Sequence, residues 1–338
     1  MIPVSEIGIV IQGPIQSVGR ILTDLTQRAH DSTLDVKKMI RESLEIGVKP
    51  TVSTWSDQNL NSFSEIEKDH ISQIAFPFAP LPKRLLNDWN KNSKYRQYYS
   101  TLAGIQELKK SKCKYVIKVR TDNYVDIKSI VNFVTRLNES DADRFIYTPL
   151  INLDKPHMFY DFYTFSSVNR LEEFCNVMLY EKEITTNIHF DVFYRWTKHV
   201  MNSKFTIRDL SLIYPNFPLF TSAQLELIRF GLRDVFRPMP KDIWTNLYWR
   251  GEQLGEQGLK AQYRFADVPM SKVLDEFDHF EYKVQEKLNI KTTSIPSFFI
   301  TSRLELNLNK ALAKLSGAKL KSTQFLRKIR DSRQKPII

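Results

Sequence analysis

Short apolar runs alternate with longer segments of helical periodicity throughout the first half of this chain. We expect one helix that begins at Ser32 and ends just before Gly47, and another from Ser93 to Leu108, because apolar residues recur there every three or four positions. Ser32 and Asp35 have the spacing of a capping box at the start of the first helix. We expect strands where short apolar runs end in turn-forming residues, at 7–11, 51–55, 71–76 and 114–120. This alternation predicts an α/β fold in which helices flank a mainly parallel sheet.

Three segments lie at or directly after the ends of predicted strands, at residues 12–14, 53–57 and 120–123. Open α/β sheets bind their ligands beyond the carboxyl ends of the strands. Because parallel strands end at the same edge of a sheet, we expect these three segments to border one ligand site.

Two of these segments contain residues suited to a nucleotide. Gly13 allows the backbone to approach a ligand closely, beside the turn residue Pro14, and Gln12 offers an amide to a base or ribose. Trp55 and Asp57 have the chemistry to pack against and hydrogen-bond the same groups. The alternatives are a plain tight turn at residues 12–14 and a core tryptophan beside a solvated aspartate.

The predicted helix from Ser93 has a small, polar face opposite its apolar stripe. Gln97, Ser100 and Gly104 share that face, and Arg96 lies at its edge. The face either borders the ligand site or allows close packing of the helix.

Four segments occur along the chain in one order, at residues 9–15, 53–55, 96–105 and 115–122. Together they resemble the WavE family of lipopolysaccharide-synthesis proteins, glycosyltransferases of the GT-A type, over roughly residues 7–125. The resemblance implies a GT-A-like (Rossmann-like) fold. It also implies transfer of a sugar from a nucleotide sugar to a lipopolysaccharide, capsule or related surface-glycan acceptor.

The resemblance draws attention to Asp122, because GT-A enzymes commonly end a central strand with an acidic motif that helps hold a divalent metal. Mn²⁺ or Mg²⁺ accepts such oxygen ligands, so Asp122 is the candidate metal ligand. The sequence has Arg-Thr-Asp-Asn here and not Asp-x-Asp. Arg120 is a candidate to pair with the donor phosphates, and Asn123 also lies in the motif. The alternative is an ordinary turn in which Asp122 or Asn123 caps a helix starting at Ile127.

Three acidic residues of the second half are candidates for the base that deprotonates an acceptor hydroxyl. Asp161 lies among aromatic residues at 159–165, a composition typical of sugar-binding clefts. Glu226 and Asp191 are the second and third candidates. The alternative for each is a surface or capping acid.

Charge is unevenly distributed over the 338 residues. Residues 303–338 contain ten basic and two acidic residues, or +8 of the total net charge of +11. The nearly neutral remainder argues against nucleic-acid binding, whereas a basic amphipathic tail suits an anionic membrane surface. With no long apolar run and no secretory pattern at the N-terminus, we expect a cytoplasmic protein that is peripheral on the inner face of the membrane.

We therefore expect three parts: a donor-binding half (1–130), an acceptor-binding half of the same domain (131–300) and a basic helical tail (301–338). The expected partners are a nucleotide sugar, an oligosaccharide or lipid-linked glycan acceptor and the membrane. The alternatives are transfer of a sugar phosphate, or a non-catalytic glycan- or membrane-binding module on the same fold.

Overall fold

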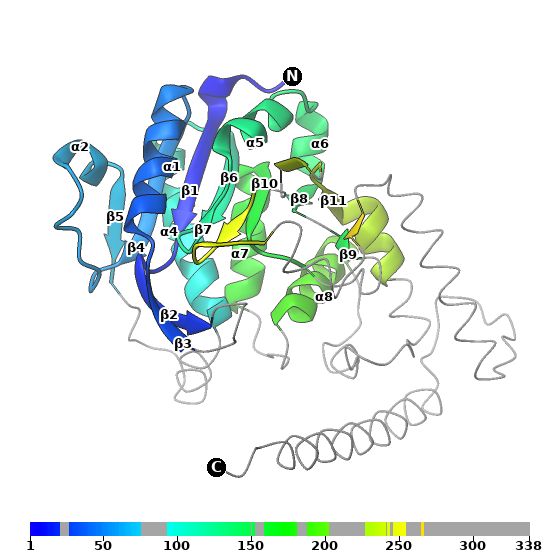
Figure 1. The fold of residues 1–338 in the computed structure, drawn as a ribbon. Helices are drawn as coiled ribbons and strands as arrows, with labels where there is room; N and C mark the ends of the chain where they lie inside the picture. Colours follow the sequence, from blue (N-terminus) through cyan, green and yellow to red (C-terminus); the bar gives the residue numbers. More distant parts are fainter. Residues whose placement is uncertain are drawn as a thin grey trace, which may run out of the picture.

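The structure, a computed structural model, describes residues 1–20, 27–75, 93–149, 151–152, 159–180, 188–202, 227–240, 242–243, 246–254 and 265–266. Its centre is a seven-stranded sheet in the order β11-β8-β10-β6-β1-β4-β5 (Figure 1). These strands are β1 (Ile7–Gln12), β4 (Lys49–Trp55), β5 (Ile71–Ile74), β6 (Tyr115–Arg120), β8 (Ile146–Thr148), β10 (Tyr163–Ser167) and β11 (Phe236–Pro238).

The sheet is mainly parallel, as the alternation of strands and helices predicts. β6, β1, β4 and β5 run parallel, and β8 and β11 share their direction, whereas β10 is antiparallel to both of its neighbours. The four predicted strands are all present, within one or two residues of their expected ends where the chain is described. The α/β fold class is therefore confirmed.

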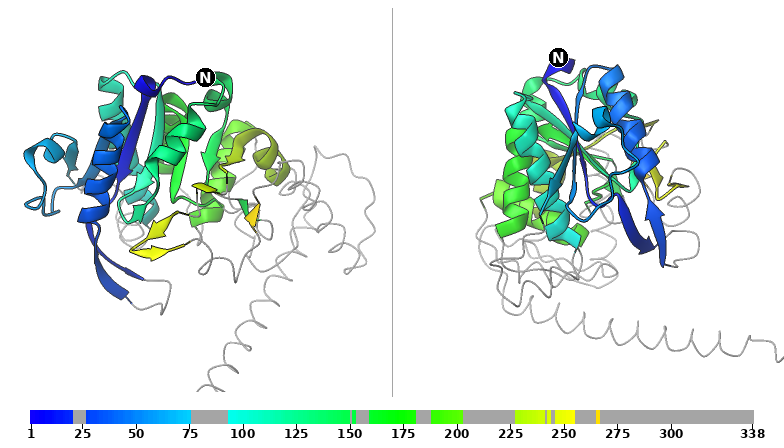
Figure 2. Two further views of the ribbon diagram at one scale, coloured as in Figure 1. Left: turned by 45° about the horizontal axis from the view of Figure 1, so that its top comes forward. Right: turned by 90° about the vertical axis from the view of Figure 1, so that its left-hand side faces the viewer.

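Helices cover both faces of this sheet, as the edge-on view in the right panel of Figure 2 shows. One face carries α1 (Thr33–Glu45) and α5 (Ile127–Val134), and the other carries α4 (Ser93–Lys110), α7 (Val168–Tyr180) and α8 (Ile188–Val200). Further described helices are η1 (Val4–Glu6), α2 (Glu65–Lys68), α6 (Glu139–Arg144) and the π-helical turn η2 (Gly231–Val235), which follows helical residues at 227–230. No helix in the described ranges has both the length and the apolarity needed to cross a bilayer.

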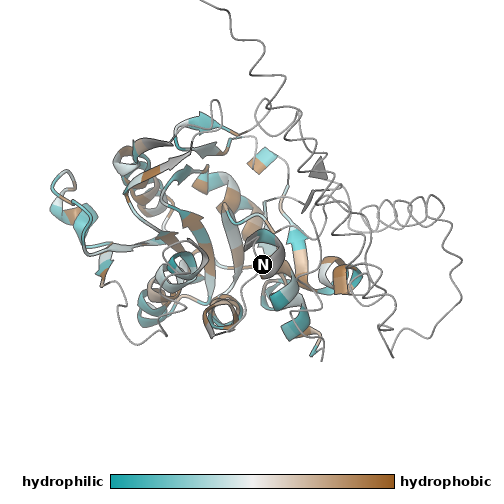
Figure 3. Cartoon of the chain, turned by 90° about the horizontal axis from the view of Figure 1, so that it is seen from below, coloured by the Kyte–Doolittle hydropathy of each residue, from teal (hydrophilic) through white to brown (hydrophobic). Residues whose placement is uncertain are grey.

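The two faces have separate cores because successive strand residues point in opposite directions. Ile9 and Ile11 of β1 pack with α1, whereas Val10 packs with α4 and α7. Figure 3 shows the resulting concentration of hydrophobic residues along the central strands. A Cβ added to Gly104 would lie 2.5 Å from the Val10 side chain, so this glycine allows α4 to approach β1 closely.

Smaller sheets complete the described part of the chain. β2 (Gln16–Arg20) and β3 (Gln27–Asp31) form an antiparallel ribbon, and β9 (Ile151–Asn152) pairs with β14 (Phe265–Ala266). β12 (Tyr248–Trp249) pairs with β13 (Glu252–Gln253) and also with β7 (Asn123–Tyr124). The β7–β12 pairing brings residues 248–250 back to the end of β6, and so to the edge of the sheet where ligands are expected.

The predicted capping box of the first helix is wrong. Ser32 occupies the N-cap of α1 but makes no side-chain capping bond, because its hydroxyl donates to the Ile15 carbonyl at 2.7 Å. Asp31 instead accepts hydrogen bonds from the backbone N–H and the hydroxyl of Thr33. The predicted tail at residues 301–338 lies outside the described residues.

Candidate functional site

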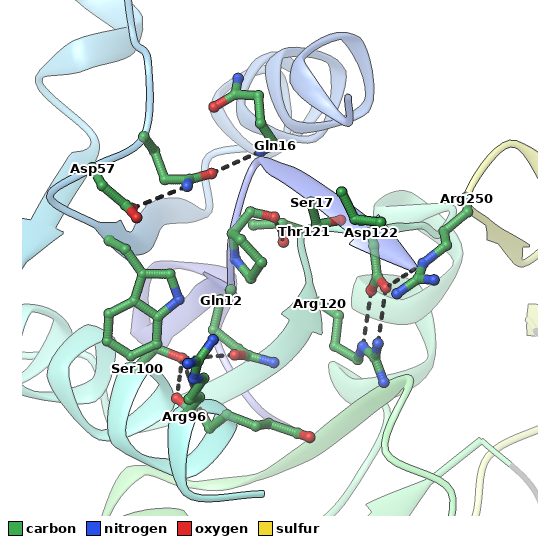
Figure 4. A pocket seen from close by; sticks show the side chains of 16 residues that line it. Gln12, Gln16, Ser17, Asp57, Arg96, Ser100, Arg120, Thr121, Asp122 and Arg250 are labelled. Carbon is green, nitrogen blue, oxygen red and sulfur yellow. Dashed lines mark hydrogen bonds and ion pairs between the residues drawn. The ribbon is translucent and has the colours of Figure 1, made fainter. Parts of the chain in front are cut away.

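A cleft of about 390 Å³ lies at the carboxyl ends of β1, β4 and β6. The chain passes from β1 to β4 and β5 on one side, then returns to place β6 on the other side of β1. This is the point where strand order reverses, where open α/β sheets bind ligands. The lining residues are Gln12, Gly13, Pro14, Gln16, Ser17, Val18, Trp55, Asp57, Gln58, Arg96, Gln97, Ser100, Arg120, Thr121, Asp122 and Arg250 (Figure 4).

The turn after β1 ties the three strand ends together. The Gly13 N–H donates to the Ser53 carbonyl at 3.0 Å, and the Thr121 hydroxyl donates to the Pro14 carbonyl at 2.7 Å. Gly13 has a φ of +120°, and an added Cβ would lie 2.9 Å from Oγ1 of Thr121. The position therefore requires glycine, and the turn is both a tight turn and part of the cleft floor.

Helix α4 supplies the wall beside this turn. The Ser100 hydroxyl donates to Oε1 of Gln12 at 2.7 Å, which fixes the buried amide of Gln12 at the cleft floor. Arg96 and Gln97 also line the cleft from α4. Burial lowers the pKa of the Arg96 guanidinium, and the charge of Asp57 opposes that shift.

The other wall is formed by β4 and the start of β2. Trp55 is buried against Tyr99, with ring centroids 6.4 Å apart and planes 11° apart. The Gln16 N–H donates to Oε1 of Gln58 at 2.7 Å, and Nε2 of Gln58 donates to Asp57 at 3.1 Å. These hydrogen bonds of the Gln58 side chain join the start of β2 to the segment after β4, so the wall presents polar groups in fixed positions.

The end of β6 carries a network of two arginines around Asp122 (Figure 4). Arg120 donates from Nε and Nη2 to the two oxygens of Asp122, at 2.9 and 2.8 Å. Arg250 donates from Nε at 3.2 Å, and the Trp249 indole donates at 3.1 Å. The backbone N–H of Arg250 also donates to the Asp122 carbonyl at 2.8 Å. Asp122 therefore orients both guanidinium groups at the cleft.

Asp161 lies behind this network and is not among the cleft-lining residues. Its carboxylate accepts from Nη1 of Arg120 at 3.4 Å, and its backbone carbonyl accepts from Nζ of the buried Lys118 at 2.6 Å. The side chain of Asp161 is only 7% exposed. Its position is that of a buried anion that holds Arg120 in place.

These contacts shift the pKa values of the buried groups. Burial would raise the pKa of the Asp161 carboxyl, but the charges of Arg120 and Lys118 hold it well below its ordinary value. Burial likewise opposes ionisation of Asp122, yet Arg120 and Arg250 hold its pKa below the ordinary value. Burial lowers the pKa of Lys118 to about 8, against the opposing charge of Asp161. Both carboxyls are thus anions at neutral pH.

Asp161 does not suit the role of general base predicted for it. A base that acts near neutral pH needs a pKa near the working pH and access to the proton it removes. Asp161 has a strongly lowered pKa and is enclosed by Arg120 and Lys118. Glu226 lies outside the described residues, and Asp191 is placed only as a position in α8.

The structure brings most of the predicted donor-binding residues together at the cleft. They are Gln12, Gly13, Pro14, Trp55, Asp57, Arg96, Gln97 and Arg120, with the predicted metal ligand Asp122. Asn123 is the exception, since it is fully buried and its amide donates to the Phe162 carbonyl at 3.0 Å. Neither Asp122 nor Asn123 caps α5, whose N-cap is Asp126.

Sequence reasoning missed Arg250 and Trp249. They reach Asp122 through the pairing of β12 with β7, which joins residues more than 120 positions apart in the chain. The short strands that form this pairing have two residues each, and no periodic pattern marks them. The cleft therefore takes one of its arginines from beyond the predicted donor half at 1–130.

The residues present do not fit the expected divalent metal. Asp122 accepts four side-chain hydrogen bonds, three on Oδ2 and one on Oδ1, so both of its oxygens already face N–H donors. A cation there would meet two guanidinium charges, and even unit charges about 4 Å apart repel by about 4 kcal/mol at an effective dielectric constant near 20.

Comparison with solved structures gives a crystal structure of mannose-1-phosphate geranyltransferase from Thermus thermophilus. The sequences are 10% identical, the match covers 56% of this chain and 67% of that chain, and the TM-score is 0.31. A TM-score this low supports no statement about shared fold or function. Comparison with curated proteins gave no match.

The family comparison is decisive for identity. The sequence profile described as WavE lipopolysaccharide synthesis matches residues 7–189, which is more than half of the chain. The match includes β1, β4 and β6 and therefore the strand ends that form the cleft floor. The chain belongs to the WavE lipopolysaccharide synthesis family.

Proposed function

We propose that this protein is a glycosyltransferase of the GT-A type that moves a sugar from a nucleotide sugar to a lipopolysaccharide, capsule or related surface-glycan acceptor. The observation that carries the proposal is the polar, arginine-containing cleft at the strand-order reversal, in a member of a lipopolysaccharide-synthesis family. Lipopolysaccharide synthesis requires sugar transfers, and a nucleotide-sized cleft with fixed cations suits their donors.

The two sides of the cleft bind different parts of the donor. On the β4 side, Gln12 at the floor and Trp55 and Asp57 in the wall offer amide, ring and carboxylate groups to a base and ribose. Arg120 lies on the opposite side, where a guanidinium pairs bidentately with phosphate oxygens. The nucleotide therefore spans the cleft from the β4 side to the β6 side.

Transfer breaks the bond between the anomeric carbon and the diphosphate oxygen, and the acceptor oxygen forms the new bond to that carbon. Negative charge grows on the departing nucleoside diphosphate, and the preorganised guanidinium of Arg120 stabilises it. In an inverting transfer a carboxylate takes the acceptor proton. Glu226 and Asp191 remain our candidates for this base, with an oligosaccharide or lipid-linked glycan as acceptor.

A thermal-shift screen of the full-length protein against nucleotide sugars tests the donor site. A ligand that binds only the native state raises the melting temperature by mass action. At a concentration one hundred times Kd, it increases the free energy of unfolding by about 2.7 kcal/mol. We expect at least one nucleotide sugar to stabilise the protein, and the same donor to have little effect on Trp55→Ala. Absence of a shift with every common nucleotide sugar would contradict the proposal.

Sugar-phosphate transfer is the second candidate, because the same cleft would hold the same donors. The two reactions release different nucleotides, so they are separable by product. A non-catalytic glycan-binding module would bind donors without turnover.

We further propose that the basic segment at 303–338 holds the enzyme on the inner face of the membrane, because +8 of the net charge lies there.

A further inference from the structure

The oxygens of Asp122 face N–H donors of the protein, which suggests that this residue orients its arginine partners and does not bind a metal. A ligand to a divalent cation directs its oxygens toward open space where the ion binds. The Asp122 oxygens instead meet donors from both sides: Arg120 on its own strand end, and Trp249 and Arg250 on β12 and the turn after it. The side chain of Asp122 is 10% exposed, and those of Arg120 and Arg250 are 24% and 13% exposed.

The network at the cleft carries a net charge of one positive unit, summed over Arg120, Arg250, Lys118, Asp122 and Asp161. Asp122 neutralises one of the two arginines, and Lys118 balances Asp161 behind them. Arg120 has five N–H donors, of which Nε and one on Nη2 bond Asp122 and one on Nη1 bonds Asp161. Its remaining donors and its charge are available to a phosphate, and Arg250 lines the cleft beside it.

We propose that Arg120 and Arg250 bind the donor diphosphate in place of a divalent metal, and that Asp122 is a positioning residue for the two arginines. This rests on the proposed nucleotide-sugar function. A metal ion supplies positive charge to the departing diphosphate, and two guanidinium groups in fixed orientations supply it without a metal. Asp122 holds them at the angle at which both face the cleft.

Direct binding measurements test this on the full-length, metal-stripped protein. The probes are UDP and GDP, titrated by calorimetry once in EDTA and once with added Mn²⁺. We expect the probe that binds to do so in EDTA with an affinity close to that in Mn²⁺. In parallel, the electron paramagnetic resonance signal of free Mn²⁺ should not fall when the protein is added without nucleotide.

Variants separate the arginines from general charge effects. Arg250→Gln should weaken binding in EDTA by about 10- to 100-fold, the worth of a charge-assisted hydrogen bond. Arg250→Lys should recover part of that loss, because it keeps the charge but not the fork of donors. Arg136→Gln is the matched control, since Arg136 is exposed and does not line the cleft, and it should bind as the wild type does.

Asp122→Asn distinguishes positioning from metal binding. A positioning role predicts weaker binding in EDTA and in Mn²⁺ alike, with circular dichroism confirming a folded protein. Binding that requires Mn²⁺ in the wild type and loses this requirement in Asp122→Asn would overturn the inference while leaving the donor cleft intact. Full-affinity binding by Arg250→Gln would also overturn it. Absence of UDP and GDP binding in every condition, together with no thermal shift from any common nucleotide sugar, would overturn both this inference and the proposed function.

Discussion

Asp122 is the residue on which the order of the cleft depends most. It holds two guanidinium groups and an indole N–H from two parts of the chain that are far apart in sequence. Removing one partner of a buried ion pair is strongly destabilising, because the remaining charge loses its compensation. Its contribution to stability and its effect on ligand binding are therefore coupled.

Replacing Asp122 should lower stability as well as affinity. We expect Asp122→Asn to reduce the free energy of unfolding by about 3 kcal/mol, because two partly buried guanidinium groups lose the charge of the Asp122 carboxylate. Urea unfolding followed by circular dichroism measures this. The exposed cleft carboxylate of Asp57 provides the control, and Asp57→Asn should change stability by less than about 0.5 kcal/mol. Equal effects from the two substitutions would contradict the network.

Lys118 makes a prediction about pH. Its folded pKa is about 8, below the ordinary value of about 10.4, so the unfolded chain binds more protons between these values. Stability should therefore rise with pH in this window, by about 1.5 kcal/mol from pH 8 to 9.5. Lys118→Met removes the titrating group, and its urea-unfolding profile should lack this rise. Parallel profiles for the two proteins would show that Lys118 does not titrate in the folded state.

At the scale of elements, the turn after β1 is the connection that shapes the cleft floor. It bonds the ends of β4 and β6 through Gly13, Pro14 and Thr121, and Gly13 adopts a backbone conformation that other residues avoid. Distortion of this turn would displace polar groups from all three strand ends at once.

Gly13→Ala should damage both the fold and the site. We expect a loss of about 2 kcal/mol of stability, because the substitution adds a contact at 2.9 Å to an unfavourable φ. Gly47→Ala is the matched control, because Gly47 also has a positive φ of 76° but has no atom within 4 Å of its added Cβ. Gly47→Ala should cost about 1 kcal/mol and leave nucleotide binding unchanged. Weakened binding in both variants would mean that the effect is not local to the cleft.

Much of this site could be located from sequence alone, because open α/β sheets bind their ligands beyond the carboxyl ends of the strands. Gln12, Trp55 and Arg120 end parallel strands of one sheet, so their shared edge follows from periodicity and order. Asn123 was misplaced because it belongs to the short strand β7, where its side chain turns inward to the Phe162 carbonyl. Arg250 was missed because the β12–β7 pairing joins residues more than 120 positions apart in the chain, and such a pairing leaves no local sequence pattern.

At the scale of the whole molecule, the charge distribution separates a nearly neutral body from a basic C-terminal segment. Residues 303–338 hold ten basic residues, and the proposed membrane contact depends on them. Electrostatic attraction to anionic lipid falls off within a Debye length, so it should be sensitive to salt.

Neutralising part of this segment should release the protein from anionic vesicles. Replacing Arg327, Lys328 and Arg330 with Gln should weaken binding by about 100-fold, at about 1 kcal/mol for each basic residue. Vesicle sedimentation at two salt concentrations measures this, and added salt should mimic the substitutions. Replacing three exposed basic residues of the body, Lys112, Lys128 and Arg136, is the control. Equal binding by both triple variants would refute a membrane role for the segment.

The nucleotide released from a UDP- or GDP-sugar donor tests the central claim most directly, because it reports the reaction without knowledge of the acceptor. Transfer of a sugar releases a nucleoside diphosphate, whereas transfer of a sugar phosphate releases a nucleoside monophosphate. The account predicts the diphosphate as the product, identified by mass spectrometry, and a large loss of its formation in Arg250→Gln but not in Arg136→Gln. Release of the monophosphate, or equal turnover by these two variants, would contradict it.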